Sequence, residues 1–66
     1  MNQLLRERMD DEMVYAVSYN GKVRNVKFVA NGSNLARGFV KVEQLSPEAG
    51  VRTFTVAKIG VITLIG

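Results

Sequence analysis

The segment "RTFTVAKI", residues 52–59, places two cations and an aromatic ring on one side of a predicted β-strand. Its alternation gives Arg52, Phe54, Val56 and Lys58 the same side. Arg and Lys bind phosphate groups, and aromatic faces bind unstacked bases at roughly 1–3 kcal/mol per stack. The segment therefore predicts an anion-binding surface. We expect a strongly bent strand, whose middle enters the core while both cations keep their charged groups in water.

The composition argues against catalysis and against metal binding. The 66 residues contain no Cys and no His, which removes thiolate ligands, the commonest general base and the commonest metal ligand. Ser18, Ser33 and Ser46 therefore have no base to activate them. The acidic run at residues 10–12 predicts a solvated cluster rather than a Mg²⁺ site, because adjacent carboxylates diverge. We expect a protein that is not an enzyme and holds no metal or cofactor.

The charge is unevenly distributed along the chain. Residues 1–13 carry two Arg against four acidic residues, whereas residues 14–66 carry seven Lys and Arg against two acidic residues. A basic body of this kind is typical of proteins that meet anions such as single-stranded nucleic acid or a nucleotide. Solubility is the alternative explanation, since small domains carry net charge for that reason as well.

No stretch of the sequence has the features of a membrane or export segment. The first eleven residues are rich in charge and contain no apolar run of signal-peptide length. The longest apolar stretch, residues 59–65, is far too short to span a bilayer. The sequence therefore predicts a cytoplasmic protein without a membrane partner.

The first residues predict a short, acidic helix that precedes a single β-domain. Asn2 is a suitable cap, and Leu5, Met9 and Met13 recur at helical spacing over this segment. From Met13 onward the period changes to two, which is typical of strands. The predicted organisation is a helical segment at residues 1–12 and a small β-barrel domain at residues 13–66.

Turn residues divide the β-domain into five short strands. Asn20-Gly21 predicts a two-residue hairpin that pairs Tyr19 with Lys22 and Val17 with Arg24. The same pairing favours a bulge beside Arg24. We expect a loop at residues 30–34, a strand at residues 38–45, a turn at Pro47, a strand at residues 51–59, a bend at Gly60 and a last strand at residues 61–65. Such a series predicts a strongly bent antiparallel barrel.

The last predicted strand carries no charge that would protect an exposed edge. Its sequence is "GVITLIG", residues 60–66. An exposed edge of this composition tends to pair with other chains. We therefore expect it to be buried, either by barrel closure or in the seam of a homodimer or higher homo-oligomer.

The order of these pieces resembles the WYL domain, a bacterial SH3-like or Sm-like β-barrel. The matching elements are Tyr19, "RNVKF" from Arg24, "GFVKV" from Gly38 and "RTFTVAKI" from Arg52. Phe39 and the two residues after it stand where the family has Trp-Tyr-Leu, and the helix-turn-helix region of many members does not fit in thirteen upstream residues. The resemblance therefore implies a degenerate, stand-alone barrel of phage or bacterial type.

In the family, the aromatic residue and the basic residues around it line a site for anionic ligands. Carried over by position, the resemblance implies that the binding residues here are Tyr19, Arg24, Phe39, Arg52 and Lys58. It implies a regulatory protein that binds nucleic acid or a nucleotide. A protein-interaction module, such as a phage-type inhibitor or adaptor acting through a sheet edge or an apolar face, is the alternative. A purely structural oligomer subunit is the third hypothesis.

Overall fold

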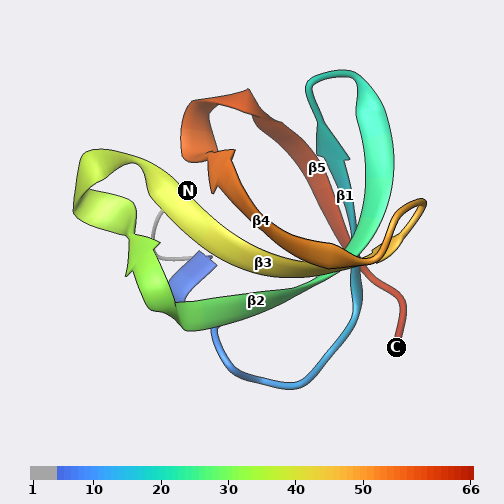
Figure 1. The fold of residues 1–66 in the computed structure, drawn as a ribbon, viewed down its shortest axis with the longest axis horizontal. Coiled ribbons are helices and arrows are strands. Elements are labelled where there is room, and N and C mark those ends of the chain that lie inside the picture. Colours follow the sequence, from blue (N-terminus) through green and yellow to red (C-terminus); the bar gives the residue numbers. More distant parts are fainter. Residues whose placement is uncertain (1–4) are drawn as a thin grey trace.

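A computed structural model describes residues 5–66 of the chain and shows a mainly β structure (Figure 1). Five antiparallel strands form one sheet in the order β4-β3-β2-β1-β5. Two short 3₁₀ helices, η1 and η2, interrupt the series of strands. The bounds are β1 Tyr15–Tyr19, β2 Lys22–Asn34, η1 Leu35–Arg37, β3 Phe39–Ser46, β4 Gly50–Thr55, η2 Val56–Lys58 and β5 Ile59–Leu64.

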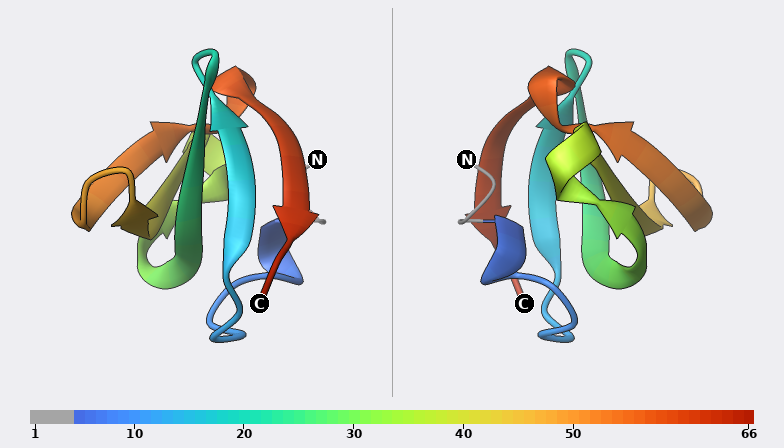
Figure 2. Two further views of the ribbon diagram at one scale, coloured as in Figure 1. Left: turned by 90° about the vertical axis from the view of Figure 1, so that its right-hand side faces the viewer. Right: turned by 90° about the vertical axis from the view of Figure 1, so that its left-hand side faces the viewer.

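The sheet is strongly bent, as predicted, but its strands do not close into a complete barrel. β4 and β5 are its two edges. They are connected through η2 and diverge from it, so that they lie on opposite sides of the curled sheet (Figure 2). The expected hydrogen-bonded closure is therefore absent from residues 5–66. The buried side chains fill the concave side of the sheet instead.

The β1–β2 hairpin has the predicted register. Tyr19 pairs with Lys22 and Val17 with Arg24. Asn20 and Gly21 both have positive φ, at 52° and 80°, as a type I′ turn requires. The pairing with β1 is regular throughout, so the bulge expected beside Arg24 does not form on this side. The register shift occurs instead where β2 pairs with β3.

The predicted N-terminal helix is wrong over the described residues. Leu5 is helical, but the chain turns from residue 7 and contains no helix of seven residues within 5–66; the rest of the prediction, residues 1–4, lies outside the described part. The Asp10 N–H donates to Phe28 O at 3.0 Å, and the Asp10 carboxylate accepts from the Ala30 N–H at 3.1 Å. These two bonds hold the segment against β2, and the positive φ of Asp10 and Glu12 turns the chain there.

Two further boundaries differ from the sequence-based expectation. The strand predicted to reach residue 59 ends at Thr55, and the corner is made by η2 rather than by a bend at Gly60. The Val56 N–H donates to Gly38 O at 2.9 Å, and the buried Val56 side chain faces the core. The loop predicted at residues 30–34 belongs to the end of β2, where the register with β3 is irregular.

The hydrophobic core draws on all five strands and on the N-terminal segment. Phe54 is 1 % exposed, and Leu5 is fully buried in the same cluster. Leu5 covers the core from outside the sheet. The N-terminal segment therefore contributes to stability although it forms no long helix. Helices long and apolar enough to cross a membrane do not occur in residues 5–66. The core residues are Leu5, Tyr15, Val17, Val26, Phe28, Leu35, Val40, Val42, Phe54, Val56 and Ile59.

Candidate anion-binding site

An aromatic pair lies on the concave side of the sheet, between strands that are not neighbours. The rings of Tyr19 on β1 and Phe54 on β4 stack with their centroids 3.9 Å apart and their planes 11° apart. The Tyr19 hydroxyl also accepts from the Thr55 N–H at 3.0 Å. The side chain of Tyr19 thereby links β1 to the edge strand β4, where the sheet itself makes no connection.

The guanidinium of Arg24 lies against this aromatic pair. Its central carbon is 5.4 Å from the Tyr19 ring centroid and 5.5 Å from that of Phe54. One terminal nitrogen of Arg24 donates to Gln44 Oε1 at 3.3 Å. Its Nε is buried and has no hydrogen-bond partner among the described residues. Two rings and an amide thus hold the cation in one place while leaving hydrogen-bonding capacity unused.

Gln44 is the buried polar residue at the centre of the site. Its side chain is 3 % exposed, and its Nε2 donates to the Glu48 carbonyl oxygen at 2.9 Å. This bond fixes the amide so that its oxygen faces Arg24. Gln44 lies opposite Gly50 in the β3–β4 register. Gly50 therefore lies next to the hydrogen bond between Arg24 and Gln44, and its missing side chain leaves space there.

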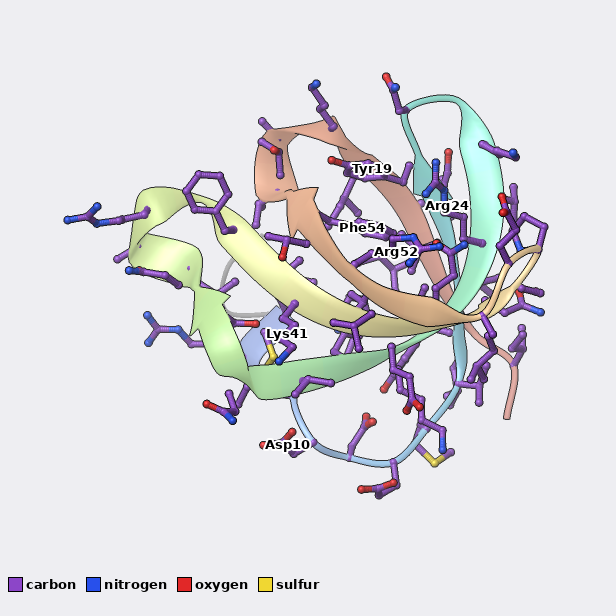
Figure 3. The ribbon with its side chains drawn as sticks, in the orientation of Figure 1. Asp10, Tyr19, Arg24, Lys41, Arg52 and Phe54 are labelled. Carbon is purple, nitrogen blue, oxygen red and sulfur yellow. The ribbon has the colours of Figure 1, made fainter. Side chains whose placement is uncertain are left out.

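The Arg52 side chain occupies that space. A Cβ placed on Gly50 would lie 2.6 Å from Nη1 of Arg52, so the guanidinium covers the bare glycine. Nη1 donates to the Val51 carbonyl oxygen at 3.0 Å. Arg24 and Arg52 therefore both reach the Gln44–Gly50 pair, one from β2 and one from β4, on the concave side of the sheet (Figure 3). We call this group, with Tyr19 and Phe54, the Arg24–Arg52 site.

Among residues 5–66, no carboxylate oxygen lies within salt-bridge distance of Arg24 or Arg52. Within residues 5–66 the one salt bridge joins Lys27 Nζ to Glu12 Oε2 at 4.0 Å, away from the site. Arg24 and Arg52 are both partly buried, so water screens their charges less than it would at a fully exposed surface. An arrangement of two forked cations favours an anion between or beside them.

The structure brings together three of the five predicted site residues. Arg24 lies against the Tyr19 ring, and Arg52 reaches the same Gln44–Gly50 pair as Arg24. Phe39 is 43 % exposed and lies on the convex face of β3, because the neighbouring Val40 points into the core. Lys58 is exposed in η2, beyond the end of β4. Phe54 is buried and the two cations are more exposed, as expected, but they do not share one bent strand, because β4 ends at Thr55 and Lys58 lies in η2.

Gln44 and Phe54 belong to the site although sequence reasoning did not assign them to it. The burial expected of the middle of this segment predicts Phe54 as a core residue, and the structure shows that its ring also contacts Arg24. Gln44 occupies an inward position of the alternating strand "FVKVEQLS". A polar side chain at an inward position is the one sequence signal that indicates it, because buried amides need a partner.

Two hollows elsewhere on the surface lack these residues. One of about 300 Å³ lies between the N-terminal segment and η1, beside Met9 and Leu35. The other, of about 170 Å³, lies over β2 and is lined by Glu12, Lys27 and Glu43 among others. Neither hollow includes Arg24 or Arg52, so the Arg24–Arg52 site is a separate surface.

Comparisons with models of protein families, with curated proteins and with solved structures find no match. The residues of the Arg24–Arg52 site and their geometry therefore indicate what this chain can bind. Arg24 has the most closely defined position, because two aromatic rings and one amide contact its guanidinium.

Proposed function

We propose that this domain is a non-enzymatic, regulatory anion-binding protein that takes the phosphate of a nucleotide or of single-stranded nucleic acid at the Arg24–Arg52 site. The observation that carries the proposal is that Arg24 contacts Gln44 and Arg52 covers Gly50, two residues that lie opposite each other in the β3–β4 register. Guanidinium forks match phosphate oxygens in geometry as well as in charge. Because Arg24 is already held in place, its ordering adds little entropic cost when a ligand binds.

The same proposal places the chain among small SH3-like barrels of the WYL type, in an open form. The strand order β4-β3-β2-β1-β5 and the short 3₁₀ helix between β4 and β5 support it. So does the position of Tyr19, Arg24 and Arg52 on one concave surface. Phe39 and Lys58 do not share that surface, so we leave them out of the proposed site.

The aromatic residues of the site favour recognition of phosphate over recognition of bases. Tyr19 and Phe54 stack on each other, and Arg24 lies beside the pair. Phe54 is 1 % exposed and Tyr19 is partly buried, so little ring surface is accessible to a base. We expect binding that depends on the number of phosphates and only weakly on base identity.

The proposal is tested by the binding of a labelled single-stranded oligothymidylate at two salt concentrations. Binding by the wild type should weaken steeply with salt, since it releases counterions. Arg52→Ala should bind more weakly and lower the slope of log affinity against log salt by about 0.7, the share of one phosphate on a single strand. Folding of each variant is checked by its thermal melt.

Arg37→Ala is the matched control. It removes the same charge from the exposed 3₁₀ helix η1, on another part of the molecule. General electrostatic attraction falls equally in both variants, so only a site at Arg52 makes them differ. Equal, small losses for the two variants, or wild-type binding insensitive to salt, would disprove the proposed site.

A further inference from the structure

The edge strand β5 exposes a row of apolar side chains and carries no charge. Val61 is 68 % exposed, Leu64 55 % and Ile65 52 %. Residues 59–66 contain no Asp, Glu, Lys, Arg or Pro. Proteins usually protect an edge strand with such residues, because its unpaired backbone groups otherwise recruit another strand. Here the composition of β5 leaves the edge open to pairing.

A β-bulge at the end of β5 determines which backbone groups point outward. The N–H groups of Ile65 and Gly66 both donate to Val14 O, at 3.0 and 3.2 Å, and the Val14 N–H donates to Gly66 O at 3.0 Å. Thr63 pairs with Ala16 in the next hydrogen-bonded position of the alternating pattern. The N–H and C=O groups of Ile62 and Leu64 therefore face away from β1, along the free edge.

The other edge of the sheet is different, because side chains already bond two of its backbone groups. On β4 the Val51 carbonyl accepts from Arg52 Nη1, and the Thr55 N–H donates to the Tyr19 hydroxyl. A strand that added to β4 would have to displace both contacts. Pairing of β4 in one copy with β5 in the next, which would build an open chain of molecules, is therefore disfavoured.

We infer that β5 pairs edge to edge and antiparallel with β5 of a second copy of this chain, about a two-fold axis at Thr63. In this register the N–H and C=O groups of Ile62 bond the C=O and N–H groups of the partner's Leu64, and the same groups of Leu64 bond those of the partner's Ile62. On the convex face Val61 lies opposite the partner's Ile65. The sequence is complementary to itself in this arrangement, since each pair is apolar except for the two threonines at the axis.

The charge distribution permits a second copy as the occupant. The chain carries a net charge of +3, so two copies repel one another, and the repulsion is weakest where they meet at an uncharged surface. β5 provides such a surface, and no like charges lie opposite each other in the pairing. Because the exposed apolar area is small, we expect a dimer that dissociates on dilution, as mass action requires.

The interface is tested by sedimentation of the full chain over about a hundredfold range of concentration. The wild type should shift from monomer to dimer, and added salt should preserve or favour the dimer because it screens the net charge. Thr63→Lys and Thr63→Glu should each remain monomeric, since like charges then face each other at the axis. An equimolar mixture of the two variants should restore the dimer.

Thr53→Lys and Thr53→Glu are the matched controls, at an exposed position on the other edge strand, β4. They should dimerise like the wild type. A second readout uses the absence of Cys from the chain. Oxidised Thr63→Cys should form a disulfide-linked dimer, because antiparallel pairs without mutual hydrogen bonds bring Cα atoms within disulfide range. Thr53→Cys should not.

Several results would overturn the inference. The wild type could stay monomeric over the whole concentration range, or it could assemble beyond the dimer. The mixture of Thr63→Lys and Thr63→Glu could fail to associate. Cysteines at positions 53 and 63 could cross-link equally well. The inference does not depend on the proposed function. Arg52→Ala should leave the dimer unchanged, and Thr63→Lys should not remove the salt-dependent binding of oligothymidylate.

Discussion

Tyr19 and Phe54 stack with their ring centroids 3.9 Å apart, although their strands β1 and β4 are not neighbours in the sheet. The contact spans the concave side and joins the hairpin to an edge strand. It also supports the Arg24 guanidinium, whose central carbon is 5.4 Å from the Tyr19 ring centroid and 5.5 Å from that of Phe54. One aromatic pair therefore links the stability of the open sheet to the position of the proposed anion-binding group.

Tyr19→Phe separates the hydrogen bond of Tyr19 from its stacking. The ring stays in place, but the Thr55 N–H loses its acceptor. We expect the free energy of unfolding to fall by about 1 kcal/mol, the usual net value of one hydrogen bond. Tyr19→Leu removes the aromatic contacts as well and should cost more. Urea denaturation measures both, and a Tyr19→Phe variant as stable as the wild type would mean that water replaces the hydroxyl.

Phe54→Ala should destabilise the domain severely, by about 3–5 kcal/mol, because it leaves a cavity in the core. Its side chain is 1 % exposed. Phe39→Ala is the matched control, since that ring is 43 % exposed on the convex face, and we expect a cost below about 1 kcal/mol. Thermal melts of the two variants provide the comparison. Similar losses in both would contradict the assignment of Phe54 to the core.

Gln44→Glu tests whether the Arg24 charge is available to a ligand. The new carboxylate would lie within reach of the Arg24 nitrogen that now bonds Gln44 Oε1. An internal ion pair would neutralise that cation, so oligothymidylate binding should fall by about tenfold or more, the effect of roughly 1.4 kcal/mol. Gln44→Met removes the amide without adding charge and should lose less affinity. If both variants bind equally, Arg24 is not part of the site.

The hydrogen bond from the Tyr15 hydroxyl to the Asp11 carboxylate predicts a pH dependence of stability. It lowers the pKa of Asp11 below its usual value, and the same bond, together with burial, raises the pKa of Tyr15. The ionised Asp11 carboxylate adds to the free energy of unfolding above its unfolded-state pKa of about 4, and this stabilisation is lost as pH falls through the lower pKa of the folded state. The protonated Tyr15 hydroxyl adds to the free energy of unfolding below about pH 10, and this stabilisation is lost as pH rises through the raised pKa of the folded state.

Urea denaturation of the wild type and Tyr15→Phe across this pH range measures the effect. The variant should be less stable near neutral pH, and the difference between the two proteins should shrink at the acidic end, where Asp11 is protonated in both. Asp11→Asn should likewise flatten the acidic side of the curve. A difference that stays constant from neutral to strongly acidic pH would show that the bond does not depend on the ionised carboxylate.

Local sequence determined the hairpin and the alternation of the strands. Asn20-Gly21 fixed the register of β1 with β2, because the positive φ values of its turn depend on two adjacent residues. Alternation likewise indicated that Phe54 is buried, that Arg52 keeps partial exposure, and that the structure is mainly β. Such features follow from the side-chain period of a strand and need no knowledge of distant residues.

Tertiary structure alone decided which of the predicted residues meet. Arg24 and Arg52 converge because β2, β3 and β4 are paired in a particular register, which carries a shift between Asn25 and Val26 that no local pattern specifies. The loss of the predicted N-terminal helix has the same origin, since the two hydrogen bonds between Asp10 and β2 outweigh the weak helix preference of its own segment. The sheet also stays open for a non-local reason: η2 turns the chain at Val56, whose side chain enters the core, and β5 then leaves β4 to pair with β1.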